Sequence, residues 1–212
     1  MPTAVAAFDW DGTLTVRDCV VPFLGRVAGN LGLGRRLLAT PGALLAAAAR
    51  RDRDGLKALG VAAAFTGRPV AEVNETGRQY ADYVASHWLR PDTLARLRWH
   101  QAMGHTVVVV SASLGPYLHP LGRELGVDGV VCSELAVRGE QFTGELAGPN
   151  CRGRHKVDRL RTWLATVGGG ARVAWAYGDS AGDEPMLACA EHPVRVGRHR
   201  LDAVPAAGGP WS

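Results

Sequence analysis

Two aspartates near the start of the chain are the first residues whose types and spacing point to chemistry. Asp9 directly follows the apolar run 4–8, and Asp11, two residues later, precedes Gly12, which can turn the chain sharply. An aspartate can accept a phosphoryl group, and a neighbouring acid can protonate the leaving oxygen and then deprotonate water. The pair predicts a phosphate-ester hydrolysis with Asp9 as nucleophile and Asp11 as general acid and base. A calcium-binding EF-hand loop is excluded because its fifth position holds Thr13.

A second group of acids, late in the chain, predicts a metal. Two carboxylates facing a phosphate would repel it, so the site needs a cation, and ligands that are all oxygens favour Mg²⁺. The segment Tyr177-Gly178-Asp179-Ser180-Ala181-Gly182-Asp183 follows another apolar run. We expect Asp179 to be a metal ligand and Asp183 to support the cluster.

The phosphoryl group also needs positive charge and hydrogen-bond donors. Ser111 follows the β-branched run 107–110, and it offers a hydroxyl together with nearby backbone N–H groups such as that of Ala112. Lys156 is one of two lysines in the chain and opens an amphipathic pattern. We expect these residues to bind the phosphoryl group.

The elements that position these residues alternate between strands and helices. The pattern predicts strands over 4–8, 106–110, 130–132, 173–177 and 192–196, and helices over 93–103, 116–125, 157–164 and 184–190. This alternation indicates a parallel sheet with helices on both faces, a Rossmann-like α/β fold that binds ligands at the carboxyl ends of its strands. Asp9, Ser111 and Asp179 would all lie at that edge.

Two insertions interrupt the alternation. Residues 16–90 show helical spacing, with Phe23, Leu24, Val27 and Leu31 on one predicted helix face, and indicate an α-helical cap. We expect a catalytic core of 1–15 and 91–212, with a β-hairpin near 134–147 around the turn at Gly139.

Composition narrows the function classes. The net charge is +4, but the arginines are scattered and no aromatic residues interleave with them, so we expect no nucleic-acid partner. The four cysteines show no Cys-x-x-Cys pair, and the seven histidines show no HxH or HxxxH spacing, which argues against a disulfide scaffold and against zinc. Without a basic leader at residues 1–8, we expect a cytoplasmic protein with reduced thiols.

The motifs together resemble the haloacid dehalogenase superfamily, over nearly the whole chain. Its four motifs match Asp9-Trp10-Asp11-Gly12-Thr13, Ser111, Lys156 and the segment 178–183. The resemblance implies an aspartyl-phosphate on Asp9, acid/base catalysis by Asp11, and Mg²⁺ held by Asp9, Asp179 and the backbone carbonyl of Asp11. Phosphatases of the superfamily have the acid that Asp11 provides, whereas its dehalogenases lack it.

The helical insertion after the first motif resembles the phosphoserine-phosphatase-like branch, subfamily IB. Members that cleave phosphoserine carry a Glu where this chain has Asp18, an arginine in the cap whose nearest counterpart here is Lys57, and an Asn where this chain has Gly182. Asp18 and Lys57 are therefore our candidates for substrate specificity, and the substrate is left as a small phosphate monoester.

The apolar segment 37–49 leaves an alternative open. Arg35, Arg36, Arg50 and Arg51 flank it, so it could lie on an anionic membrane surface, although it is too short to span one. We favour packing of this segment inside the cap. The alternatives are a phosphatase of phospholipids or head groups at a membrane surface, and a phosphate-binding regulatory module without turnover.

Overall fold

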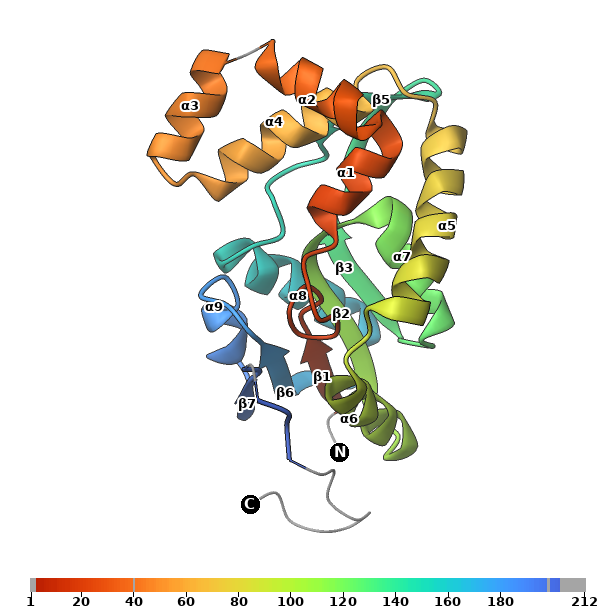
Figure 1. Ribbon diagram of the computed structural model, residues 1–212. Coiled ribbons are helices and arrows are strands. Elements are labelled where there is room, and N and C mark those ends of the chain that lie inside the picture. Colours follow the sequence, from red (N-terminus) through yellow and green to blue (C-terminus); the bar gives the residue numbers. More distant parts are fainter. Residues whose placement is uncertain (1–2, 40, 198, 203–212) are drawn as a thin grey trace.

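The computed structural model describes residues 3–39, 41–197 and 199–202 of the chain, drawn as a ribbon in Figure 1. A parallel sheet of five strands occupies its lower part in that view. The strands are β1 (Ala4–Phe8), β2 (Thr106–Leu114), β3 (Gly129–Ser133), β6 (Arg172–Gly178) and β7 (His192–Arg195), in the order β3-β2-β1-β6-β7. The chain runs outward from β1 to β3 and then crosses to β6, so the strand order reverses between β1 and β6. Such a reversal is where open parallel sheets bind ligands.

Both faces of the sheet are covered, which is why its central strands are apolar throughout. Ala6 and Phe8 of β1 pack in one core cluster with α5 (Val70–His87), α6 (Pro91–Ala102) and α7 (Gly115–Glu124), whereas Val5 and Ala7 pack in a second cluster with α8 (Arg154–Val167) and α9 (Glu184–Leu187). Successive strand residues point to opposite faces, so a strand buried on both sides shows no alternation. The three-layer Rossmann-like fold predicted from the sequence is confirmed.

Four helices lie beyond the carboxyl ends of the strands, in the upper part of Figure 1. They are α1 (Val20–Ala28), α2 (Asn30–Leu38), α3 (Pro41–Ala49) and α4 (Arg53–Phe65). The sequence pattern places Leu31 on one helix face with Phe23 and Val27, but Leu31 belongs to the separate helix α2 and is 87% exposed. Gly29, with φ 71 and ψ 138, ends α1, so α2 starts with a new direction and the helical phase is lost.

The hairpin strands β4 (Leu135–Arg138) and β5 (Gln141–Leu146) pair antiparallel and connect β3 to α8. They form a separate two-stranded sheet, and β5 lies against α4. The hairpin therefore joins the helices above the sheet to the end of β3.

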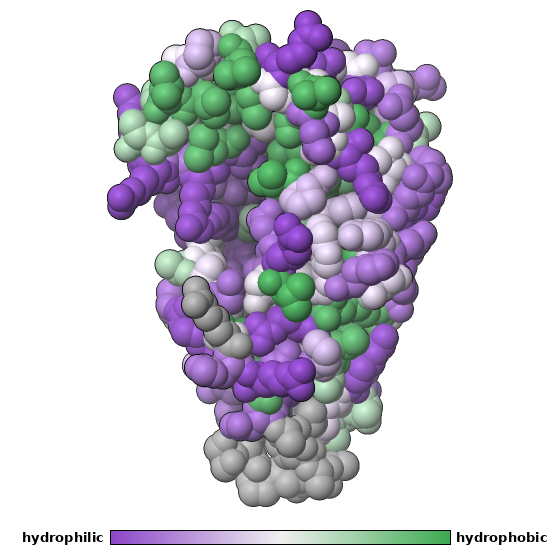
Figure 2. Space-filling model, in the orientation of Figure 1, coloured by the Kyte–Doolittle hydropathy of each residue, from purple (hydrophilic) through white to green (hydrophobic). Residues whose placement is uncertain are grey.

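The described residues of the apolar segment 37–49, which are 37–39 and 41–49, are not buried, and the prediction that the segment packs inside the cap is wrong. No residue of α2 or α3 is buried, and Leu38 and Leu45 are 70% and 69% exposed. Figure 2 shows the resulting hydrophobic area at the upper left, over α3. The neighbours of α3 are α2 and α4, so its outer side faces solvent. No helix in the described part of the chain is long and apolar enough to cross a bilayer.

Candidate active site

Three carboxylates meet where β1 and β6 end. Asp9 directly follows β1, Asp179 directly follows β6, and Asp183 precedes α9; ligand atoms of the three lie within 4.8 Å of one another. We call this set the acidic cluster. The backbone N–H of Asp9 donates to the carbonyl of Tyr177 at 2.9 Å, so the pairing of the two strands fixes the spacing of the loops that carry the acids.

Lys156 supplies the positive charge that holds the acidic cluster together. Its side chain extends from the first turn of α8, is 2% exposed, and places Nζ 2.5 Å from Asp9 Oδ1 and against Asp183 Oδ1. Burial alone would lower the pKa of Lys156, but the carboxylates of Asp9 and Asp183 raise it above its usual value. The ammonium group therefore stays charged, as phosphate binding requires.

The pKa values of Asp9 and Asp183 shift in opposite directions, although burial acts to raise both. Burial raises the pKa of Asp9 to about 6, against the opposing charge of Lys156. Burial also acts to raise the pKa of Asp183, but Lys156 and Ser180 outweigh it and hold that pKa below its usual value. Asp183 is thus a fixed anion whose Oδ2 accepts from Ser180 N–H at 3.0 Å and from Ser180 Oγ at 2.7 Å.

Asp11 is held by two donors and carries a raised pKa. Its Oδ1 accepts from the Cys19 backbone N–H at 2.7 Å, and its Oδ2 accepts from Ser113 Oγ at 2.5 Å. Burial, and next the negative charge of Asp18, raise the pKa of Asp11 to about 7. A carboxyl group with this pKa can exist in either protonation state near neutral pH, which suits a general acid and base.

Gly12 lets the two acid-bearing loops approach closely. Its φ is +80, and a Cβ there would lie 2.3 Å from Asp179 Oδ2. Any side chain would be strained by the backbone angle and would also displace the carboxylate. The glycine of the first motif therefore fixes the distance between the loops after β1 and β6.

Ser111 and Ala112 lie one strand away from Asp9. The strand was expected to end at Val110, but β2 continues to Leu114, while its register against β3 shifts beyond Val110. Ser111 is buried, and its Oγ accepts from the Ser113 N–H at 3.0 Å. Both Ser111 and Ala112 line the same cavity as Asp9 and Lys156.

Lys57 and Asp18 bring the helices above the sheet to this site. Lys57 extends from α4 and donates to the Ala112 carbonyl and, at 2.5 Å, to Asn150 Oδ1. Burial lowers its pKa to about 8, with the negative charge of Asp11 opposing that change. Asp18 is exposed and accepts from the backbone N–H groups of Val20 and Val21, at 3.0 and 3.2 Å, where α1 begins.

One cavity of about 660 Å³ is lined by the acidic cluster, Asp11, Ser111, Ala112 and both lysines. Its floor is the acidic cluster with Asp11, Ser111 and Lys156, and its upper walls come from α1 and α4. The lining includes every site residue that the sequence predicts, namely Asp9, Asp11, Asp18, Lys57, Ser111, Ala112, Lys156, Asp179 and Asp183. The fold therefore brings every predicted site residue to one cavity.

The donor set of the cavity fits Mg²⁺. All its candidate ligands are carboxylate or carbonyl oxygens, and Mg²⁺ prefers such hard ligands. On the floor of the cavity the four acids Asp9, Asp11, Asp179 and Asp183 outnumber the ammonium group of Lys156, which binds two of them, and this excess of acids favours a cation. Because both oxygens of Asp183 already bind Lys156 and Ser180, Asp9 and Asp179 are better placed than Asp183 to bind a cation directly.

Three residues of the site were missed in the sequence. Ser113 binds Asp11, Tyr117 Oη donates to Ser113 Oγ at 2.7 Å, and Asn150 binds Lys57. Ser113 could have been found, because residues two apart on a strand share a face and Ser111 was already a candidate. Asn150 comes from the loop before α8, and no local pattern distinguishes it from an ordinary turn residue.

The parallel sheet and the acids at its carboxyl edge define an α/β enzyme of the Rossmann-like class. The family model described as haloacid dehalogenase-like hydrolase matches residues 6–188, and the chain belongs to this family of hydrolases.

Relatives extend the comparison. The chain is 39% identical over 188 residues to protein CicA of Caulobacter vibrioides, covering 88% of this chain and 83% of that protein. It is 31% identical over 199 residues to a phosphoserine phosphatase of Halobacterium salinarum, covering 91% and 85%. A crystal structure of a Bordetella pertussis protein of unknown function superposes with a TM-score of 0.70 at 22% identity, covering 89% and 87%. The chain is a phosphoserine-phosphatase-like member of its family.

Proposed function

We propose that this protein is a Mg²⁺-dependent phosphatase that hydrolyses a small phosphate monoester through an aspartyl-phosphate on Asp9. The observation that carries this proposal is the buried contact of Lys156 with both Asp9 and Asp183, beside an Asp11 that is held by Ser113 and Cys19. A nucleophile, a fixed cation and an acid with a pKa near neutrality are the groups that phosphoryl transfer requires.

In the first step an oxygen of Asp9 attacks phosphorus and the bond to the leaving oxygen breaks. Asp11 gives its proton to that oxygen, so the product leaves as an alcohol. Lys156, Ser111 and the N–H groups beside Ser111 and Ala112 bind the phosphoryl oxygens as negative charge develops on them. The Ser113 hydroxyl orients the Asp11 carboxyl group toward the leaving oxygen.

In the second step Asp11, now ionised, takes a proton from water, and the resulting hydroxide attacks phosphorus. The acyl-phosphate bond breaks, which restores the Asp9 carboxylate and releases inorganic phosphate. Mg²⁺, held by Asp9, Asp179 and the Asp11 carbonyl with Asp183 in support, would neutralise the phosphoryl charge and orient the group when bound.

We further propose that residues 16–90 act as a cap over a core of 1–15 and 91–212. Lys57 and Asp18 line the upper part of the cavity, so they are placed to select the leaving group. Two donors of Lys57 already bind Ala112 and Asn150, which leaves the third for an anionic group of the substrate. Relatives named phosphoserine phosphatase support a phospho-amino acid as the first substrate to test.

A cytoplasmic location completes the proposal, and buried thiols at Cys19, Cys132 and Cys151 support it.

A phosphate-release screen tests this function. Phospho-amino acids, sugar phosphates, nucleotides and glycerophospholipid phosphates are each supplied with and without Mg²⁺. We expect at least one soluble ester to be hydrolysed, with turnover lost on removal of Mg²⁺. If every ester stays inert with Mg²⁺ present, the regulatory module without turnover replaces the enzyme as the better proposal.

The exposed apolar surface of α3 supports a second candidate function, a phospholipid or head-group phosphatase at a membrane surface. Leu38 and Leu45 face solvent, and basic residues flank the segment at Arg35 and Arg50. Co-sedimentation with anionic liposomes distinguishes the candidates, with Leu45→Ser as the variant that should release the protein. Activity on soluble esters without any liposome binding would remove this candidate.

A further inference from the structure

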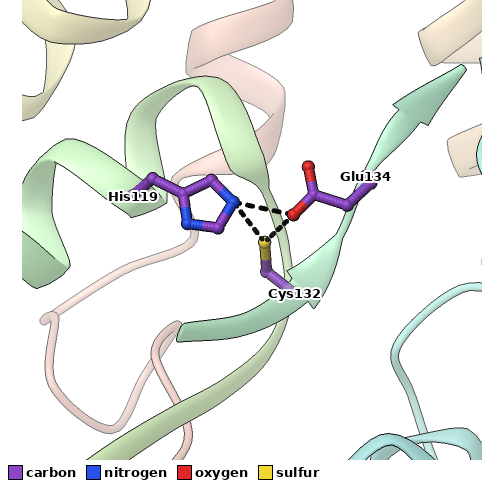
Figure 3. Close-up of side chains that lie close together, drawn as sticks. All are labelled: His119, Cys132 and Glu134. Carbon is purple, nitrogen blue, oxygen red and sulfur yellow. Dashed lines mark hydrogen bonds and ion pairs between the residues drawn. The ribbon is translucent and has the colours of Figure 1, made fainter. Parts of the chain in front are cut away.

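A second group of metal-binding side chains lies outside the catalytic cavity. His119 of α7, Cys132 of β3 and Glu134, in the link between β3 and β4, point toward one another, as Figure 3 shows. Glu134 Oε1 lies 2.7 Å from His119 Nε2 and 3.1 Å from Cys132 Sγ, and Sγ lies 3.8 Å from Nε2. We call this set the thiol cluster. None of its members lines the cavity that holds Asp9.

We propose that the thiol cluster is a zinc site with one histidine, one cysteine and one glutamate as ligands. Tetrahedral zinc with bonds of about 2.0 Å to nitrogen and oxygen and about 2.3 Å to sulfur separates its ligand atoms by about 3.3–3.5 Å. The three separations in the protein, 2.7, 3.1 and 3.8 Å, lie close to these values, so side-chain shifts of a few tenths of an ångström would admit the ion.

The donor atoms favour zinc over magnesium. A thiolate, an imidazole and a carboxylate form a mixed set of the kind that binds Zn²⁺, whereas Mg²⁺ requires hard oxygen ligands and octahedral geometry. The acidic cluster offers oxygens alone. The two clusters should therefore select different metals from the same solution.

Zinc binding at this site would release a proton. In the metal-free protein, burial and the neighbouring Glu134 raise the pKa of Cys132, and the thiol donates to Glu134 Oε1. Zinc takes the place of that proton: the S–H bond breaks, an S–Zn bond forms, and the proton leaves to solvent. Affinity for zinc should therefore fall as the pH is lowered.

The site is reachable and has room for a fourth ligand. Cys132 is only 3% exposed, but the side chains of His119 and Glu134 are 42% and 45% exposed. Both line a cavity of about 370 Å³ between α5, α7 and the β4–β5 hairpin, whose walls also carry Arg78 and Arg123. A water molecule or a small anion in this cavity could complete the tetrahedron.

Cobalt substitution tests the proposal, because a cysteine thiolate bound to Co²⁺ gives an intense charge-transfer absorption that oxygen ligands do not give. Metal-free protein in excess Mg²⁺, which occupies the acidic cluster, is titrated with Co²⁺ and then with Zn²⁺. We expect one equivalent of Co²⁺ to bind with this absorption, and one equivalent of Zn²⁺ to displace it.

Variants locate the site. Cys132→Ser should abolish the absorption, and His119→Gln should raise the Co²⁺ dissociation constant at least about tenfold, as the loss of one ligand does. Cys189→Ser, at the exposed cysteine, and Asp179→Asn, in the acidic cluster, should leave the absorption unchanged. Circular dichroism and thermal unfolding without metal check that each variant is folded, and His119→Gln decides the matter if the buried Cys132→Ser does not fold.

Two results would overturn the proposal. The first is a wild-type protein that binds Co²⁺ without the thiolate absorption, which would make the cluster a hydrogen-bonded group only. The second is an absorption that survives in Cys132→Ser or disappears in Cys189→Ser. Neither result bears on phosphatase activity, which depends on the other cluster.

Discussion

The acidic cluster and the thiol cluster each bring three ligand groups within 4.8 Å of one another. They differ in what balances their negative charge when no metal is bound. In the acidic cluster the permanent cation Lys156 already neutralises part of the charge, and Asp183 is a fixed anion. In the thiol cluster a proton on Cys132 fills the same role. The first is organised before any metal arrives, whereas the second must lose a proton to bind one. Lys156 thus keeps the acidic cluster ready for the proposed phosphoryl transfer, whereas zinc binding by the thiol cluster should depend on pH.

The largest expected effect is a loss of turnover, and it should follow from a substitution in the acidic cluster but not from one in the thiol cluster. Asp9→Asn removes the nucleophile, so turnover should fall below about a thousandth of the wild-type value, measured as phosphate release with Mg²⁺. His119→Gln is the matched control in the thiol cluster and should keep at least about half of the activity. Near-normal turnover in Asp9→Asn would remove Asp9 from its assigned role.

The next effect concerns the cation of the acidic cluster. Lys156→Met leaves Asp9 and Asp183 buried without their shared partner, so the free energy of unfolding should fall by about 3–5 kcal/mol. Urea unfolding in the absence of divalent metal measures this loss. Lys57→Met is the control, because that amine binds two neutral acceptors and its loss should cost about 1 kcal/mol. Equal losses in the two variants would contradict a preorganised cluster.

A smaller expected effect is the stabilisation of the fold by zinc, which should depend on the thiol cluster and not on the acidic cluster. Zinc at about a hundredfold excess over its dissociation constant should raise the free energy of unfolding by about 2.7 kcal/mol. Thermal unfolding should show this gain in the wild-type protein and in Asp179→Asn, but not in Cys132→Ser. If Asp179→Asn loses the gain and Cys132→Ser keeps it, zinc binds the acidic cluster instead.

The smallest effect is a dependence of stability on pH that Asp11 causes. The folded-state pKa of Asp11 is raised from 3.8 to about 7 by burial, so this group favours the folded state most below about pH 4, and that contribution is lost as the pH rises through 7. In Asp11→Asn the side chain does not titrate, so this pH-dependent loss of stability is absent. Between pH 4 and pH 8, without divalent metal, the variant should gain at least about 1 kcal/mol in unfolding free energy relative to wild type.

Asp18→Asn serves as the control for this experiment, because Asp18 only adds to the effect of burial on Asp11. It should change the pH dependence less than Asp11→Asn does. Parallel stability curves for wild type and Asp11→Asn would show that the Asp11 carboxyl group is not perturbed as we describe.

The sheet and the acidic cluster could be predicted because their signals are local. Asp9 and Asp179 each follow an apolar run, and the carboxyl ends of parallel strands share one edge, so their meeting follows from the element pattern. Lys156 stands out because the chain has only two lysines. These residues needed no knowledge of tertiary packing.

The thiol cluster and the exposed α3 could not be predicted, for a different reason. His119, Cys132 and Glu134 meet only because α7 packs beside β3, so the spacing of the histidines, which argued against zinc, carried no information about this site. The apolar composition of 37–49 indicated burial, but nothing in it says whether another element covers the segment. Both depend on how helices dock, which periodicity does not specify.

Gly12 also bears on how this protein could diverge. Because a Cβ at this position would overlap the Asp179 carboxylate and the backbone angle disfavours any side chain, a change there disturbs the loops after β1 and β6 together. The exposed surfaces of α2 and α3 carry no such constraint, since none of their residues is buried. Over evolutionary time the reaction should therefore be inherited as a fixed unit, while new substrates are acquired through changes in the helices above it.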